Sequence, residues 1–433
     1  MVTIYINLFN WYSVKFLHIV YFLLTVLAFG FIGCTYQDGE KIPENLKDLQ
    51  NLIVIQKNNL PETSIKFTRD LSIGGSNSLG TWYYDVSSSG WAFGGSDWFA
   101  GLEVDDRGNI LVGDRYEKVI HIFDSGGNYV KKIGGEGNGP GEFESIFQIK
   151  IHSDQLLAFD RFQFRTTFFS INSLDLIEVQ KAYINRAPQR EELKGQFAHP
   201  VSLISDDLFI VGFLSEPRNA NYGTEKYNLD EERSVRYYVM DREGKVISDM
   251  ITELKDLKNI TAVVDGRHLF NMRALPFLQQ PMTSISNDGN IFTANSENPL
   301  IKMHDDKGDY IKAFYIPMEK KLIDRNEILN QFAGDDEENT NLLLKAELPE
   351  KWPALSGMVI DDEYNLWIST IPANDSLYEW LIINNAGKLI ATFRWPGNRS
   401  IEKIKNGYVY ARETQKSTGL QSITRYRIEL EGI

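Results

Sequence analysis

Short apolar runs separated by turns of Asp, Asn and Gly follow one another along most of the chain. The clearest unit covers residues 102–143, and its apolar runs are Leu102–Val104, Ile110–Val112, Val119–Phe123 and Tyr129–Ile133. Runs of β-branched and aromatic residues bounded by such turns are typical of antiparallel strands joined by tight connections. The unit therefore predicts a four-stranded antiparallel sheet.

Two kinds of turn recur in a fixed order in the units that follow. The turn before the second strand occurs at Asp105–Asn109, Asn287–Asn290 and Asp361–Asn365. The turn before the fourth strand occurs at Asp241–Gly244, Asp305–Gly308 and Asn384–Gly387. Asp and Asn side chains hydrogen-bond the backbone of their own turn, and Gly accepts a positive φ. Because one such sheet cannot bury both of its faces alone, the repeats predict a ring of packed sheets, a β-propeller.

The spacing of the runs predicts the number of blades. Complete blades are expected at residues 101–134, 146–180, 200–250, 282–316 and 357–394. A last blade has only three strands of its own, at residues 401–404, 408–412 and 422–430. Residues Ile65–Leu71 can supply its fourth strand, which would fasten the two ends of the chain together and remove the exposed edges. The sequence thus predicts an all-β fold, a six-bladed β-propeller of four-stranded antiparallel blades closed by an N-terminal strand.

Two polar insertions interrupt this pattern. Residues Glu216–Ser234 indicate a loop between strands of one blade. Residues Pro317–Pro353 are longer, and a short helix is expected near 319–332 because its apolar residues fall near one helical face. The acidic run Asp335–Glu338 is expected to end this helix as a solvated charged loop, with a cation or partner site as the alternative.

The N-terminus has a different composition from the rest of the chain. Residues 1–33 are largely apolar and contain Lys15 but no acid, and the single cysteine of the protein, Cys34, follows directly. We expect residues 1–33 to be a targeting segment, residues 34–50 a polar tether and residues 51–433 the propeller. An uncleaved transmembrane anchor is the alternative, because about 18 apolar residues nearly span a bilayer.

Charge and cysteine usage exclude several classes of function. The formal net charge is −14, and no stripe of Arg and Lys offsets it, so nucleic acid is not expected as a partner. One thiol permits neither an intramolecular disulfide nor a cysteine-based zinc site. The glycine cluster Gly134–Gly141 lacks the G-x-G-x-x-G pattern of phosphate-binding loops and predicts a tight connection between blades. No cofactor is expected.

Two Asp-Arg pairs occupy equivalent strand ends in successive blades, Asp114-Arg115 and Asp160-Arg161. An Asp at this position can accept hydrogen bonds from backbone donors of the turn that follows. The guanidinium groups would recognise carboxylate or phosphate if they faced the mouth of the central channel. Arg115 and Arg161 are therefore candidate binding residues.

The Gly- and Ser-rich stretch after Leu71 contains several large aromatic residues and indicates an ordered aromatic loop. Trp91 and Trp98 are its candidate binding residues, because interfaces favour large amphipathic side chains. No Ser-His-Asp set and no G-x-S-x-G motif can be placed, so no catalytic residue is predicted. The paired acids Asp105-Asp106, Asp305-Asp306 and Asp361-Asp362 lack the EF-hand pattern and are assigned to turns, and no metal site is predicted.

The residues Phe31–Cys34 resemble the lipobox of bacterial lipoproteins, a resemblance that implies Cys34 as the lipid attachment site. The segments 104–109, 120–124 and 135–143 resemble six-bladed β-propeller lipoproteins of the Bacteroidetes type, which are related to NHL-repeat propellers. The resemblance implies the fold and a place in the cell envelope, at the outer membrane of a Gram-negative bacterium. It carries no activity, because propellers serve as binding proteins, lyases and lactonases alike.

These observations favour binding over catalysis. We expect a lipid-anchored envelope protein whose propeller binds a protein, peptide or glycan partner and which meets the membrane only through its lipid. A metal-dependent hydrolase or lyase, similar to propeller lactonases, is the alternative, and it would need carboxylates converging on the central channel. A structural role within a larger envelope assembly is the third possibility.

Overall fold

The computed structural model describes residues 42–56, 63–74, 98–184, 190–214, 228–229, 233–258, 260–264, 267–270, 275, 277–332, 337–371, 377–415 and 417–432. The chain divides into two compact units, residues 1–48 and residues 49–433. In the described part of the first unit, Glu44–Leu46 forms a 3-10 helix, η1. No helix in the described parts of the chain is long and apolar enough to cross a membrane.

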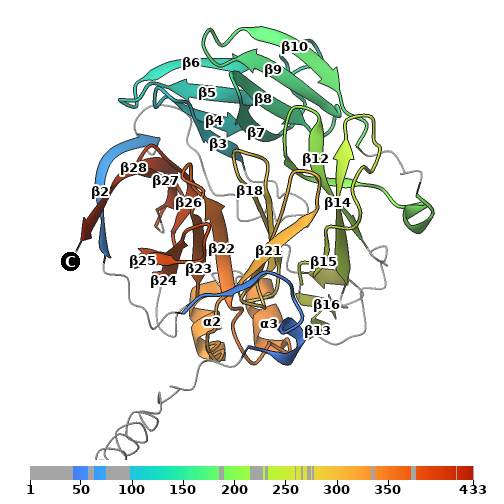
Figure 1. The fold of residues 1–433 in the computed structure, drawn as a ribbon, viewed down its shortest axis with the longest axis vertical. Helices are drawn as coiled ribbons and strands as arrows, with labels where there is room; N and C mark the ends of the chain where they lie inside the picture. The colour runs from blue at the N-terminus through green and yellow to red at the C-terminus, as the bar shows by residue number, and fades with distance from the viewer. Residues whose placement is uncertain are drawn as a thin grey trace, which may run out of the picture. The chain divides into compact units, whose positions relative to one another are not determined.

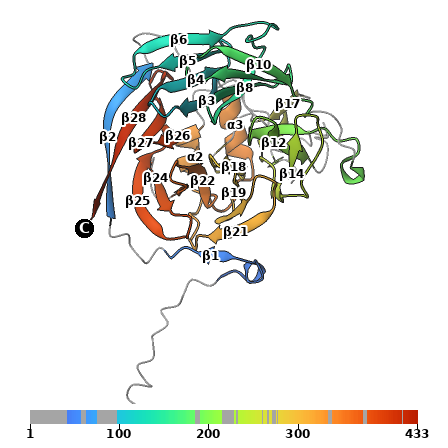
Figure 2. The same ribbon diagram turned by 45° about the horizontal axis from the view of Figure 1, so that its top comes forward.

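The strands of residues 49–433 form six blades arranged in a ring (Figure 1, Figure 2). Blade 1 contains β3 (Phe99–Val104), β4 (Ile110–Asp114), β5 (Val119–Phe123) and β6 (Tyr129–Gly134). Blade 2 contains β7 (Ile146–His152), β8 (Gln155–Asp160), β9 (Arg165–Ser170) and β10 (Leu176–Lys181). A 3-10 helix, η2 (Glu191–Leu193), precedes blade 3, which contains β11 (His199–Leu203), β12 (Leu208–Leu214), β14 (Ser234–Asp241) and β15 (Thr252–Lys255).

The second half of the ring repeats the same antiparallel order. Blade 4 contains β18 (Pro281–Ile285), β19 (Ile291–Asn295), β20 (Leu300–His304) and β21 (Tyr310–Tyr315), and β1 (Leu52–Val54) adds a parallel fifth strand to β21. Blade 5 contains β22 (Leu355–Ile360), β23 (Leu366–Thr370), β24 (Leu377–Ile383) and β25 (Leu389–Pro396). Blade 6 contains β26 (Arg399–Lys405), β27 (Tyr408–Thr414), β28 (Gln421–Gly432) and β2 (Thr63–Gly74). The predicted six-bladed β-propeller is confirmed.

The apolar core lies between neighbouring blades. One buried cluster joins Leu111 and Ile120 of blade 1 to Ile149 and Phe169 of blade 2. Because each blade is covered on both faces, its middle strands are buried along their whole length, as β4 and β5 are in blade 1. This explains why these strands appear in the sequence as continuous apolar runs without polar alternation.

The repeated Asp turns have the structure that their sequence predicts. Asp105 Oδ1 accepts hydrogen bonds from the backbone N–H groups of Arg107 (2.9 Å) and Asn109 (2.8 Å). In blade 5, Asp361 Oδ1 accepts from the equivalent N–H groups of Glu363 and Asn365. Gly108 provides the positive φ, 81°, that completes the first of these turns. The carboxylates therefore organise their own turns, as predicted.

The ring is closed by β2, which pairs with β28 of the C-terminal segment. The antiparallel register runs from Thr63 opposite Gly432 to Gly74 opposite Ser422, with one irregularity between Arg69 and Leu71. The predicted closure by an N-terminal strand is therefore confirmed, and the paired segment extends beyond the predicted Ile65–Leu71 at both ends.

The insertion before blade 5 differs from the prediction. Helix α2 covers Arg325–Phe332, whereas residues 319–324 lie outside it, and Ile323 N–H donates to Glu350 O (2.9 Å). A second helix, α3 (Glu337–Lys345), was not predicted. The acidic run 335–338 does not form the expected loop throughout, because residues 337 and 338 are the first two of α3.

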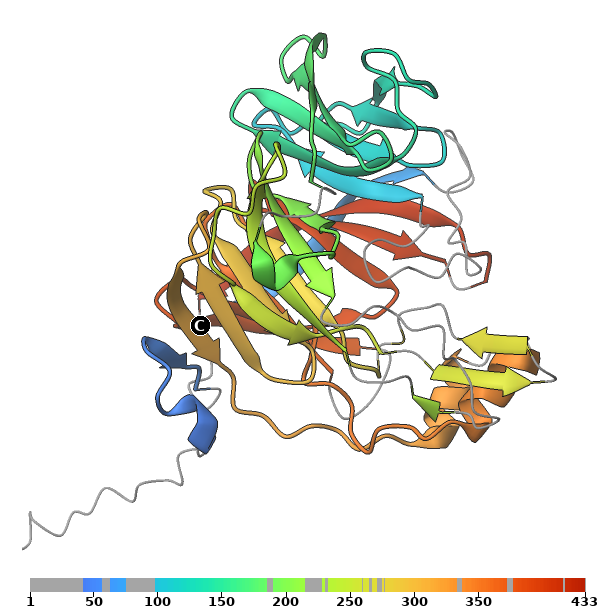
Figure 3. The ribbon, with the colours of Figure 1, turned by 90° about the vertical axis from the view of Figure 1, so that its right-hand side faces the viewer.

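A small sheet that the sequence did not predict lies beside these helices. It contains β13 (Asn228–Leu229), β16 (Ile260–Val264) and β17 (Arg267–Phe270). Ile260 of β16 shares a buried cluster with Ile328 of α2 and Leu343 of α3. Figure 3 shows α2 and α3 beside β16 and β17, together at one side of the ring. Of the polar insertion predicted as the loop 216–234, residues 216–227 and 230–232 lie outside the described residues.

Blade 3 also ends later than predicted. The fourth strand was expected directly after the turn at Asp241–Gly244, but Val246 makes only an isolated bridge to Met240. The Ser248 hydroxyl accepts a hydrogen bond from the backbone N–H of Val239 (2.8 Å). A side chain therefore takes the place of a backbone partner from the fourth strand at this position. The regular fourth strand, β15, therefore begins at Thr252, and the expected boundary at residue 250 is corrected to Lys255.

We predict that Phe67→Ala destabilises the closed ring. The Phe67 ring of β2 packs against Phe393 (4.7 Å between centroids) and Trp395 (5.1 Å) of blade 5. Removing it should cost about 3 kcal/mol of unfolding free energy, measured by urea denaturation. The adjacent Lys66→Ala is the matched control and should cost less than about 1 kcal/mol, because its ion pair with Glu429 is exposed. Equal effects of the two substitutions would contradict the packing role of β2.

Candidate binding site

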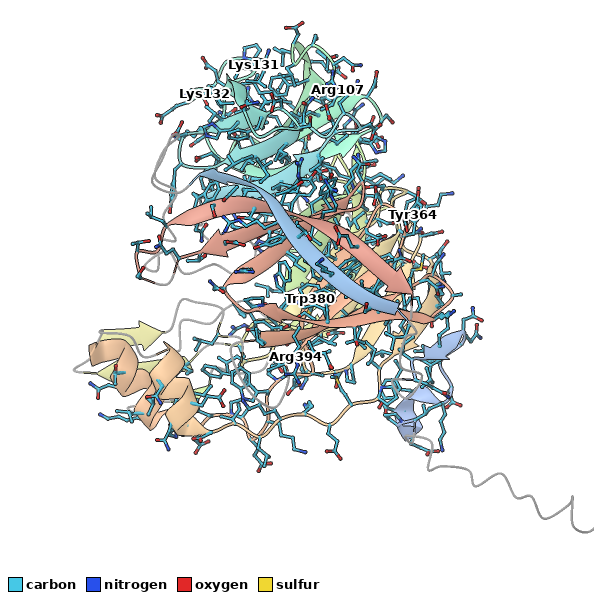
Figure 4. The ribbon with its side chains drawn as sticks, turned by 90° about the vertical axis from the view of Figure 1, so that its left-hand side faces the viewer. Arg107, Lys131, Lys132, Tyr364, Trp380 and Arg394 are labelled. Carbon is cyan, nitrogen blue, oxygen red and sulfur yellow. The ribbon has the colours of Figure 1, made fainter. Side chains whose placement is uncertain are left out.

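The turns that follow the first and third strands of each blade lie on one face of the ring, here called the turn face. Arg107 and Tyr364 belong to such turns in blades 1 and 5, and Figure 4 shows them on the same face, opposite α2 and α3. The first strands β3, β7, β11, β18, β22 and β26 are the innermost strands of their blades. Residues at the carboxyl ends of these strands therefore meet where the ring's central axis reaches the turn face.

A pocket of about 340 Å³ opens at this point, and we call it the axial pocket. Residues that line it are Glu103, Asp105, Asp106 and Arg107 of blade 1, Ile151, His152, Ser153, Asp154, Ile171 and Asn172 of blade 2, Asn287 of blade 4, and Lys403 and Lys405 of blade 6. Blades 1 and 4 lie on opposite sides of a six-bladed ring (Figure 2). A pocket that touches both therefore lies over the axis.

Oppositely charged pairs form much of the lining. Lys403 Nζ lies 2.8 Å from Glu103 Oε2, and both side chains are largely buried, at 19% and 13% exposed. Lys405 Nζ donates to Val104 O (3.0 Å) and to Asp106 Oδ1 (2.8 Å). This hydrogen bond to Lys405 is the main reason that the pKa of Asp106 lies below its ordinary value.

Arg107 adds a third pair at the rim. Its guanidinium lies 2.9 Å from Asp105 Oδ2 and donates to Ile171 O (2.8 Å) of blade 2. The Arg107 side chain is 53% exposed, whereas that of Asp105 is buried. Asp105 and the Ile171 carbonyl thus fix the guanidinium, while about half of the Arg107 side chain remains exposed to solvent. In this arrangement Arg can still contact a carboxylate-bearing ligand.

Lys150, on β7, lies close to this charged network but is itself buried. Its Nζ donates to Leu203 O (3.2 Å) of blade 3. Burial lowers the pKa of Lys150 to about 8, an effect that the negative charge of Glu103 opposes and the positive charge of Lys403 reinforces. Lys150 therefore interacts electrostatically with Glu103 and Lys403 of the pocket, and it hydrogen-bonds the backbone of blade 3.

The structure brings the predicted Arg115 and Arg161 together, but away from the axial pocket. Arg115 Nε donates to Ile146 O (3.0 Å), and the Arg161 guanidinium lies over the rings of Phe147 (5.6 Å) and Phe162 (5.3 Å). Both arginines thus lie beside the first residues of β7, whereas the axial pocket is lined by the last residues of β7. Burial lowers the pKa of Arg161 from its ordinary value.

The aspartates of the two Asp-Arg pairs have the structural role that the sequence predicts. Asp114 Oδ1 accepts the N–H groups of Tyr116 (2.9 Å) and Glu117 (2.8 Å). Asp160 Oδ1 accepts the equivalent N–H groups of Phe162 (2.9 Å) and Gln163 (3.0 Å). The two turns are therefore the same structure in successive blades.

Trp98 requires a correction. Its side chain is only 1% exposed, packs in the cluster between blades 6 and 1, and donates from Nε1 to Gln421 Oε1 (2.7 Å). It is a core residue, and its ring offers no surface to a partner. Trp91 and Cys34 lie outside the described residues, as do residues 1–41 and 75–97.

The residues of the axial pocket were not predicted from the sequence as a binding site. A signal was present, because Glu103, Lys403 and Lys405 interrupt apolar strands whose faces should be covered by neighbouring blades. Unpaired charges are costly in such positions, so charged residues there imply partners on other strands. The sequence could not show which strands supply them.

Comparisons with known proteins support the fold. The DUF5128 family model, described as a 6-bladed beta-propeller, matches residues 102–266, less than half of the chain. No curated protein matches the sequence. These findings assign neither a ligand nor an activity.

Solved structures of similar fold have low sequence identity. A putative exported protein from Bacteroides fragilis is 11% identical with a TM-score of 0.41, over 88% of this chain and 99% of that one. A member of the duf4221 family from Bacteroides vulgatus is 11% identical with a TM-score of 0.44, over 85% of this chain and 99% of that one. BamB from Moraxella catarrhalis is 11% identical with a TM-score of 0.33, over 84% of this chain and 100% of that one. With identities and TM-scores this low, these similarities carry no conclusion about this chain.

We predict that Lys150→Met stabilises the protein at pH 7. The unfolded chain holds the Lys150 proton up to about pH 10.5, whereas the folded chain releases it near pH 8. Between these values the unfolded state binds more protons, so the stability of the unsubstituted protein rises with pH. The advantage of Lys150→Met should therefore be largest below pH 8 and shrink toward pH 10, as measured by urea denaturation across this range. A pH-independent difference would show that Lys150 is not buried as a charged group at neutral pH.

Proposed function

We propose that this protein is a lipid-anchored propeller of the cell envelope that binds a polar peptide segment of another envelope protein in the axial pocket. The observation that carries the proposal is the pocket's lining, in which cations and carboxylates lie together around one opening of about 340 Å³. A peptide segment with charged and amide groups can exchange hydrogen bonds with both kinds of side chain.

The charge balance of the pocket supports a ligand with groups of both signs. Glu103, Asp105 and Asp106 are each paired with a cation of the lining, so none of the three presents an isolated charge. A purely anionic ligand would have to compete with these carboxylates for Lys403, Lys405 and Arg107. A segment with both carboxylate and amine groups can contact the exposed parts of both partners, as complementary interfaces do.

The composition of the lining favours a peptide over a glycan. No Phe, Tyr or Trp belongs to the described residues that line the axial pocket. The described lining therefore offers a sugar ring no flat apolar face to pack on. The charged side chains, the amides of Asn172 and Asn287 and the imidazole of His152 instead suit hydrogen bonding to backbone and polar side-chain groups.

A metal-dependent hydrolase or lyase is the alternative for this position. It would need carboxylates that converge on a metal ion near the axis. Here Lys403 engages Glu103, and Lys405 engages Asp106, so an ion would first have to displace these ammonium groups. For this reason binding is preferred to catalysis.

The envelope location is part of the proposal and rests on the sequence. Residues 1–33 would direct export, Cys34 would carry the lipid, and residues 34–50 would separate the lipid from the propeller beginning at residue 51. The proposed relationship to NHL-repeat lipoproteins of the Bacteroidetes type rests on residues 104–109, 120–124 and 135–143. An outer-membrane lipoprotein would place the axial pocket within reach of other envelope proteins.

We predict that a photo-crosslinking amino acid at Asn172 captures a partner protein in intact cells. Asn172 is exposed and lines the axial pocket, so a bound segment would lie beside it. The matched control is Glu363, which is exposed in a first turn of blade 5 and does not belong to the described pocket lining. Mass spectrometry should identify one adduct that forms at position 172, is absent at 363 and weakens in Lys403→Met.

A second control uses Cys34→Ser, which should leave the membrane fraction and lose the adduct because its partner lies in the envelope. Equal capture at positions 172 and 363, or capture unaffected by Lys403→Met, would contradict the assignment of the axial pocket. Membrane retention of Cys34→Ser, with no acyl label on the unsubstituted protein, would contradict the lipid anchor.

A further inference from the structure

We propose that Asp114, Glu117 and His121 of blade 1 form a binding site for a divalent transition-metal ion, separate from the axial pocket. One potential ligand atom from each residue lies within 4.8 Å of the other two. Asp114 ends β4, Glu117 belongs to the turn that follows, and His121 is the third residue of β5. The register that places Val112 opposite His121 brings the three side chains to the same side of the blade.

The distances suit an ion better than direct hydrogen bonds. His121 Nε2 lies 3.6 Å from Asp114 Oδ2 and 3.9 Å from Glu117 Oε2, both beyond a good hydrogen bond. Two ligand atoms on one tetrahedral zinc ion, each about 2.1 Å from the metal, are about 3.4 Å apart. Small side-chain movements would therefore bring the three atoms onto one ion.

Asp114 is held in the orientation that a ligand requires. Its Oδ1 accepts two backbone N–H groups of its turn, from Tyr116 and Glu117, and this directs Oδ2 toward His121. Hydrogen bonds to the second oxygen of a ligating carboxylate commonly fix its position in metal sites. The turn thus supplies the supporting contacts before any ion binds.

The equivalent turn of blade 2 shows that the fold does not require these three residues. Asp160, Gln163 and Thr167 occupy the positions of Asp114, Glu117 and His121, and the Asp160 turn makes the same two backbone hydrogen bonds. There, Oδ2 of Asp160 accepts the backbone N–H groups of Glu144 and Ser145. Gln163 Nε2 donates to Gly137 O (2.7 Å). Blade 2 therefore satisfies the same turn without a histidine or a second carboxylate.

The charges of the cluster also favour a cation. The Asp114 side chain is 3% exposed and lies beside the partly exposed Glu117 carboxylate, so a buried negative charge has a second negative charge next to it. Lys132 of β6 compensates in part, with Nζ 3.2 Å from Glu117 Oε2. A divalent ion would neutralise both carboxylates and release Lys132, whose side chain is 53% exposed and can return to solvent.

The ligand set indicates the class of metal. Imidazole nitrogen suits zinc and related transition-metal ions, whereas Mg²⁺ and Ca²⁺ prefer sites made entirely of oxygen. Three protein ligands leave a fourth tetrahedral position open. The Glu117 side chain is 39% exposed, and it provides the route by which an ion and a fourth ligand reach the site. We therefore assign the site to Zn²⁺ or a similar ion.

The test is calorimetric titration of ZnCl₂ into the full-length, tag-free protein in detergent after treatment with a chelator. We expect one Zn²⁺ per chain at this site. Glu117→Gln should weaken binding by about tenfold to a hundredfold, because it removes a charged ligand at a partly exposed position without touching the core. The matched control is Glu136→Gln, an exposed acid of the same blade paired with Lys118, which should bind zinc like the unsubstituted protein.

The zinc affinity of Lys132→Met is a second measurement, and it should not change if the cluster is purely structural. Because Lys132 competes with the ion for Glu117, its removal should tighten zinc binding severalfold. Absence of stoichiometric zinc uptake, or equal affinity in Glu117→Gln and the unsubstituted protein, would overturn the proposal. Uptake of Mg²⁺ or Ca²⁺ in preference to Zn²⁺ would overturn the assignment to a transition-metal ion.

Discussion

The pairing of β2 with β28 is the interaction on which the rest of the propeller depends. It joins residues 63–74 to residues 422–432 through a long antiparallel ladder with one irregularity between Arg69 and Leu71. Arg425 reinforces it, with Nε 3.0 Å from Asp70 Oδ1 and NH1 2.7 Å from Ser125 O of blade 1. Because the paired segments are distant in sequence, their pairing must offset a large loop-closure entropy, and a long ladder with apolar contacts on both neighbouring blades does so.

Closure also assembles the candidate binding site. Glu103 lies on β3 of blade 1, and its partner Lys403 lies on β26 of blade 6, so this buried pair spans the junction between the first and last blades. Lys405 likewise crosses from blade 6 to Val104 and Asp106 of blade 1. An open ring would separate these charges and expose them to water. The axial pocket therefore exists only in the closed protein, so the proposed ligand binding would depend on the pairing of β2 with β28.

The parts of the fold that the sequence predicted well are those set by local interactions. The Asp105 carboxylate bonds to N–H groups two and four residues away, so its turn can be recognised from a short stretch of sequence. The phase of such turns predicted the blades and the missing fourth strand of blade 6. The roles of Asp114 and Asp160 followed from the same local chemistry.

The features that were missed depend on distant contacts. Trp98 lies in the core because Gln421 and the neighbouring blades meet it there, and nothing near Trp98 in sequence indicates this. Helix α3 depends on packing against α2 and β16, which its own acidic start did not suggest. The proposed metal site at Asp114, Glu117 and His121 was not predicted because these side chains approach one another only through the pairing of β4 with β5.

Native-state hydrogen exchange tests the central role of the β2–β28 pairing most directly. If the pairing of β2 with β28 holds the ring together, backbone amides of these strands should exchange only through the same global opening as amides of the buried strands β19 and β23. Their free energies of opening should then be equal and should fall together with added denaturant. Exchange of the β2 amides at a much lower free energy, with β19 and β23 still protected, would show that the blades are stable without closure and would contradict this account.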